Sequence, residues 1–115
     1  MALTLTQREA DGTLVITGTG RIVLGNETST LRDRVKEALQ QKHQQIVLNL
    51  AGVEFIDSSG LGTLVGLYTT ARAQGAQIRL ANLSKRFHEL LQITKLLTVF
   101  DVFDSEKAAI DSFRD

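Results

Sequence analysis

The chain has 115 residues, no cysteine and no proline, and its 13 basic side chains are balanced by 13 acidic ones. Without cysteine there are no disulfides or thiolate metal sites, and a formal charge of zero argues against a nucleic-acid-binding surface, which is usually basic. No apolar run approaches the ~20 residues that span a bilayer and no signal-peptide pattern is present, so we predict one cytoplasmic domain over residues 1–115, without a membrane segment.

The N-terminal residues predict a β-hairpin. Leu3 and Leu5 alternate with threonines, as in a strand with one buried face. Asp11-Gly12 is a strong signal for a two-residue turn, and the return strand is predicted over residues 14–17.

A loop, a helix and a buried strand are predicted next. Residues 18–26 contain three glycines and are predicted as a loop. Helix-capping residues at 26–29 precede an amphipathic helix in which Leu31, Val35 and Leu39 recur every four residues. The apolar run at 46–50 follows, and its position after a helix predicts a central strand that is buried on both faces.

The second half of the chain continues the alternation of helices and strands. The predicted elements are a helix over 59–74, a strand over 77–81, a helix capped by Ser84, a strand over 98–103 and a helix capped by Ser105. The whole order is β-β-α-β-α-β-α-β-α. It predicts an α/β fold with a mixed, mostly parallel sheet flanked by about four helices.

The run Asp57-Ser58-Ser59-Gly60-Leu61-Gly62 joins the predicted central strand to the second helix. Asp and Ser are common helix caps, so capping alone is one interpretation. Two glycines in a first helical turn each cost up to ~1 kcal/mol relative to alanine, however, and so indicate a further role. The turn also lies at the carboxyl end of a strand, where open α/β sheets place their sites, and a helix N-terminus tolerates an anion.

Two segments, 47–50 and 55–62, resemble the signature of the STAS-domain anti-sigma-factor antagonists, or anti-anti-sigma factors. The resemblance extends over nearly the whole chain. It implies a bacterial partner-switching protein in transcription regulation, in which Ser58 is phosphorylated by a kinase that is itself the anti-sigma factor. The unphosphorylated protein binds this serine kinase and so releases a sigma factor, and a PP2C-type serine phosphatase resets the switch.

The same resemblance implies which residues bind the partner. They come from the serine turn and from the loop before the first helix, whose only acidic residue is Glu27. The expected partner-binding residues are Asp57, Ser58, Ser59, Gly60, Leu61, Gly62, Arg21, Asn26 and Glu27. Leucines between residues 90 and 97 are expected in the core, and an exposed patch there would indicate a second binding surface.

Other functions have less support in the sequence. His43 and His88 have no metal-ligand spacing, the serine turn lacks the pattern of a nucleophile elbow, and the early glycines form no dinucleotide fingerprint. We therefore predict no enzyme, metal or cofactor. A STAS scaffold subunit of a signalling or transport complex, without a phosphorylation switch, is the alternative function, and weak homodimerisation stays open.

Overall fold

The computed structural model describes residues 3–114, and a five-stranded sheet with the order β1-β2-β3-β4-β5 forms its centre. The strands are β1 (Thr4–Ala10), β2 (Thr13–Ile22), β3 (Gln45–Ile56), β4 (Gln77–Ala81) and β5 (Asp101–Phe103). β1 and β2 are antiparallel, and all other neighbours are parallel. The hairpin turns at Asp11-Gly12, where both residues have the positive φ of a tight hairpin turn.

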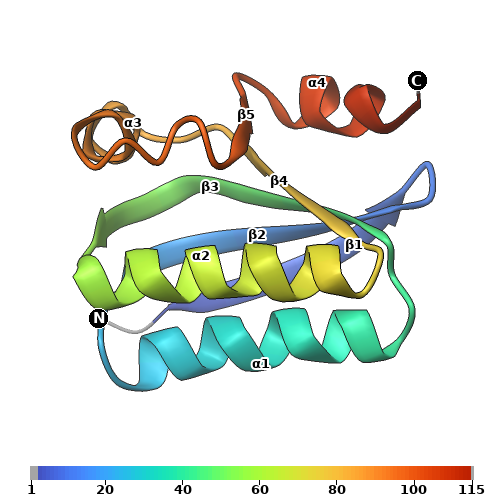
Figure 1. Ribbon diagram of the computed structural model, residues 1–115, viewed down its shortest axis with the longest axis horizontal. Coiled ribbons are helices and arrows are strands. Elements are labelled where there is room, and N and C mark those ends of the chain that lie inside the picture. The colour runs from blue at the N-terminus through green and yellow to red at the C-terminus, as the bar shows by residue number, and fades with distance from the viewer. Residues whose placement is uncertain (1–2, 115) are drawn as a thin grey trace.

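Helices cover both faces of this sheet (Figure 1). Figure 1 shows α1 and α2 side by side under one face, with α4 on the opposite side and α3 near one end. Their bounds are α1 (Asn26–Gln40), α2 (Ser58–Ala73), α3 (Lys85–Ile93) and α4 (Glu106–Asp111), followed by a 3-10 turn over Ser112–Arg114. The predicted α/β class and the predicted order of elements are confirmed.

The sheet has a core on each side because β3 buries alternate side chains in opposite directions. Ile46 and Leu48 enter the larger core, beside Leu31 of α1. Val47 enters a smaller core with Ala109 of α4. The prediction of a central strand with two buried faces is therefore confirmed, and the near-continuous apolar run is the cause.

The prediction of a loop over residues 18–26 is wrong for the first half of that range, because β2 continues to Ile22. Gly18 pairs with Leu5 of β1 and Gly20 pairs with Val53 of β3, while the pairing with β3 has register shifts after Thr17 and after Gly20. A Cβ on Gly18 would lie 3.5 Å from a side-chain carbon of Leu50, which is an ordinary van der Waals distance, so packing alone does not require glycine at this position. Gly18 and Gly20, two of the three glycines that indicated a loop, thus lie at irregularities within a long strand.

Two further predictions need correction. The strand predicted over 98–103 covers only Asp101–Phe103, because the residues before it form a turn in which the amides of Val99 and Phe100 donate to the Leu96 carbonyl. The capping residues at 26–29 do not cap α1. The N-cap is Gly25, which forms no side-chain cap hydrogen bond.

β3 projects beyond its neighbour β4. It pairs with β4 only as far as Asn49, whereas its pairing with β2 continues to Ile56. The last residues of β3 therefore have a sheet partner on one side only, and α3 packs near this end, where Phe87 and Leu91 enter the larger core. This projecting end of β3 leads directly into α2.

Candidate functional site

The serine turn begins where β3 ends. Asp57 has an extended backbone and is the N-cap of α2, and its side chain accepts a hydrogen bond of 2.8 Å from the Gly60 amide. Ser58 is the first residue of the helix and is exposed, whereas Ser59 is half-buried. The capping interpretation of the sequence is therefore confirmed for Asp57, and it leaves the Ser58 side chain at the surface.

Asp57 also holds the end of β2 against the turn. Its second carboxylate oxygen accepts a hydrogen bond of 3.1 Å from the Leu24 amide. Its own amide donates to the carbonyl of Ile22 at 3.2 Å. The loop before α1 and the serine turn are thus joined through one residue, and the sequence contained no local signal for the bond to Leu24.

The two glycines of the turn differ in their surroundings. Gly60 is buried, and a Cβ there would overlap the carbonyl oxygen of Ile22 and lie 2.6 Å from Cγ1 of Ile56. Gly62 is exposed, and a Cβ there would meet nothing within 4 Å. Packing inside the protein therefore explains Gly60, whereas Gly62 leaves bare helix backbone at the surface next to the serines.

The remaining expected partner-binding residues lie at different depths. Leu61 is buried in the larger core, so its side chain anchors the start of α2 and is not exposed to a partner. Arg21 is exposed, and its guanidinium lies 5.4 Å from the centre of the Phe55 ring. Asn26 and Glu27 form the first turn of α1. Within residues 3–114, neither of these two forms a hydrogen bond or ion pair with the serine turn.

Two apolar side chains near the serine turn were missed by the sequence reasoning. Leu24 is 75% exposed and Phe55 is 40% exposed. Large exposed apolar groups beside a polar turn are typical of a protein-binding surface. The sequence contained a signal for each of them. Leu24 lies in a loop next to a glycine, and Phe55 follows Glu54 at the end of a strand.

The pKa of the Asp57 carboxyl is lowered, first by the hydrogen bond from the Gly60 amide and then by that from the Leu24 amide. The folded state favours the ionised carboxylate of Asp57. The stability that this carboxylate contributes is therefore complete above the pKa that an Asp carboxyl has in the unfolded chain, ~3.9. That contribution is lost as the pH falls through the lower pKa of the folded state.

We expect Asp57→Asn to lower the Tm by a few degrees at pH 7, because the amide has one acceptor oxygen instead of two and no charge. The difference from the wild type should shrink below pH ~4. Thermal unfolding by circular dichroism at pH 7 and pH 3 measures both effects. Asp33→Asn, which removes an exposed carboxyl from α1, is the matched control. An Asp57→Asn difference that is the same at both pH values would contradict this role of the carboxylate.

Two arrangements bear on metal binding and catalysis in the described part of the chain: a cluster of metal ligands and a histidine beside Ser58. Among residues 3–114, no three His, Asp or Glu side chains gather as metal ligands. His43 follows α1 and His88 lies on α3, and no hydrogen bond joins either side chain to Ser58 within those residues. The described helices include none with both the length and the apolar character that a membrane crossing requires.

The geometry defines a small α/β module that holds a serine exposed at the start of a helix. The family model of the STAS domain matches residues 4–109. The anti-sigma F factor antagonist of Paenibacillus polymyxa is 30% identical over 112 residues, which cover 96% of this chain and 94% of that protein. The chain therefore belongs to the STAS-domain family of anti-sigma factor antagonists, and the resemblance found in the sequence is confirmed.

Solved structures agree with this fold. A putative anti-sigma factor antagonist from Thermotoga maritima has a TM-score of 0.88 at 20% identity, covering 96% of this chain and 95% of that one. The Bacillus cell fate determinant SpoIIAA, solved in its phosphorylated form, has a TM-score of 0.73 at 23% identity, covering 96% and 99%. At these identities the likeness concerns the fold alone.

Proposed function

We propose that this protein is a phosphorylation-controlled binding switch in the bacterial cytoplasm and not an enzyme. In its unphosphorylated form it binds an anti-sigma-factor serine kinase and so releases a sigma factor. Phosphorylation of Ser58 prevents that binding, and a PP2C-type phosphatase restores it. The observation that carries the proposal is the exposed Ser58 at the first position of α2, beside a cap that holds the turn in place.

The position of Ser58 suits a phosphoacceptor. Its side chain forms no hydrogen bond or ion pair with the other described residues, so its hydroxyl is available to a kinase. A helix N-terminus carries about half a positive charge, which tolerates the roughly −1.5 to −2 charge of a phosphate. The Asp57 carboxylate lies next to it in the chain and adds negative charge. Phosphorylation would thus change the charge of the surface and leave the fold intact.

The surroundings of Ser58 suit a protein partner. Exposed Leu24 and Phe55 supply apolar contact area, and bare backbone at Gly62 allows close approach. The chain has no net charge, so long-range steering is weak and the partner would be selected by shape and local charge. The names of the relatives, which are antagonists of anti-sigma factors, support a partner from the anti-sigma factors.

Incubation with the cognate kinase and ATP, followed by peptide mass spectrometry, tests the site. We expect one phosphate on Ser58. Ser58→Ala should abolish the modification, and Ser59→Ala, which changes the half-buried neighbour, should retain it. Phosphate on Ser59, or on neither residue, would contradict the assignment of Ser58.

A further inference from the structure

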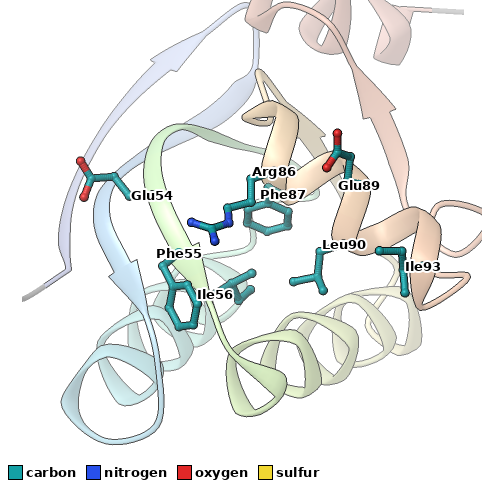
Figure 2. Close-up of a pocket in the computed structure, with 8 residues that line it drawn as sticks. All are labelled: Glu54, Phe55, Ile56, Arg86, Phe87, Glu89, Leu90 and Ile93. Carbon is teal, nitrogen blue, oxygen red and sulfur yellow. The ribbon is translucent and has the colours of Figure 1, made fainter.

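A hollow opens between the projecting end of β3 and helix α3, close to the serine turn (Figure 2). Its volume is about 290 Å³, near the lower end of the ~300–1,000 Å³ typical of ligand pockets. It exists because β3 has no strand partner on this side beyond Asn49. The residues that line it are Glu54, Phe55, Ile56, Arg86, Phe87, Glu89, Leu90 and Ile93.

The walls of this pocket are mostly apolar. Phe55 and Ile56 come from β3, and Phe87, Leu90 and Ile93 come from α3. Phe87 and Ile56 are buried at its base, whereas Ile93 is 78% exposed at its rim. The leucines between residues 90 and 97, which were expected in the core, belong to the larger core or pack against it. The large exposed apolar residue in this region is therefore Ile93 and not a leucine.

Arg86 provides a positive charge at the pocket. In Figure 2 its side chain reaches from α3 across Phe87 toward β3, whereas the carboxylates of Glu54 and Glu89 point away from the hollow. None of these three charged groups forms an ion pair with another residue in the described range 3–114. The guanidinium is therefore available to a ligand, and its geometry favours a carboxylate.

We propose that this pocket binds a small amphipathic carboxylate, such as a medium-chain fatty acid. The apolar tail would lie between β3 and α3, and the carboxylate would accept hydrogen bonds from Arg86. An apolar pocket with a single converging charged group is the usual form of such a site. This binding goes beyond the proposed switch and does not depend on a kinase.

The pocket also contacts the serine turn from inside. Ile56 belongs to its lining, precedes Asp57 in the chain and packs against Gly60 in the first turn of α2. A ligand that displaces Ile56 would therefore press on the residues that position Ser58. Through this contact the ligand concentration would influence the switch.

Titration of the ¹⁵N-labelled protein with octanoate, octanol and octylamine tests the site. We expect octanoate to shift amide signals in residues 54–56 and 86–93. It should bind about three- to ten-fold more tightly than octanol, because only octanoate forms a charged hydrogen bond with Arg86. The preference is modest because this hydrogen bond is partly exposed to solvent. Octylamine should bind most weakly. Arg86→Gln should remove the preference for octanoate, whereas Lys85→Gln, an equal loss of charge on the adjacent exposed residue, should keep it.

A second variant tests the apolar wall. Ile93→Asp adds a negative charge at an exposed position, so the fold should tolerate it, and octanoate binding should weaken at least as much as in Arg86→Gln. Gln92→Asp adds the same charge outside the lining and is the control. Equal affinity for octanoate, octanol and octylamine would overturn the proposal. That result is expected if the pocket instead receives an apolar side chain of a partner protein. Shifts confined to residues away from both the pocket and the serine turn, or no shifts, would also overturn the proposal.

Discussion

Gly60→Ala should lower the free energy of unfolding by about 3 kcal/mol, the upper part of the range for overpacking in a core. The new methyl group would overlap the carbonyl oxygen of Ile22 and lie 2.6 Å from Ile56 Cγ1. Backbone at the end of β2 cannot move away easily, because the Asp57 amide hydrogen bonds to that carbonyl. Urea unfolding followed by circular dichroism measures the loss.

Gly62→Ala is the matched control for this prediction. The same methyl group two residues further along α2 meets no atom within 4 Å. Because alanine is a better helix former, stability should rise by roughly 0.5–1 kcal/mol. Equal effects of the two substitutions would show that packing against Ile22 does not explain Gly60. Weaker partner binding by the more stable Gly62→Ala would indicate that the partner approaches the bare backbone.

Phosphorylation of Ser58 should weaken kinase binding by about a thousand-fold, equivalent to ~4 kcal/mol, which is within the effect of one unpaired charge in an interface. Ser58→Asp carries less charge and should produce a smaller loss in the same direction. Because Ser58 is exposed, the amide spectrum should change only near the turn and the loop hydrogen bonded to it. Isothermal titration calorimetry and NMR spectra of the phosphorylated and unphosphorylated protein measure these effects.

Thr69→Asp is the control for charge alone, since Thr69 is an exposed residue near the other end of the same helix. It should leave kinase affinity unchanged. Kinase binding that is equally tight for Ser58→Asp and wild type would contradict a switch at this surface. Spectral changes throughout the sheet would instead indicate refolding, which the exposed position of Ser58 does not lead us to expect.

Features that depend on neighbouring residues were predictable from the sequence. The strand Gln77–Ala81 has its predicted bounds. Ser84 and Ser105 cap their helices as predicted, each accepting a hydrogen bond from an amide three residues later. The serine turn itself was identified from its capping residues and its position after a buried strand. In each case a few adjacent side chains determine the local structure.

Features that depend on distant residues were not predictable in this way. Gly18 and Gly20 indicate a loop when read locally. Pairing of Gly18 with Leu5 of β1 and of Gly20 with Val53 of β3 makes them part of a strand. The difference between Gly60 and Gly62 depends on Ile22, which lies far away in the chain. The pocket beside Arg86 likewise exists because β3 extends beyond the end of β4. The length of this extension depends on the register in which the two strands pair. A pattern along the chain contains no information on such contacts.

The projection of β3 past β4 also bears on how a kinase would reach its substrate. A phosphoacceptor hydroxyl has to enter the active site of another protein, where a rigid domain surface fits poorly. Here the strand leading to Ser58 is hydrogen bonded on one side only after Asn49. Segments with fewer hydrogen bonds open locally at lower free energy than the centre of a sheet. The β3 segment before the serine turn should therefore open at lower free energy than the centre of the sheet, so that the turn, held in shape by Asp57, can move as a unit toward the kinase while β4 and the two cores stay folded.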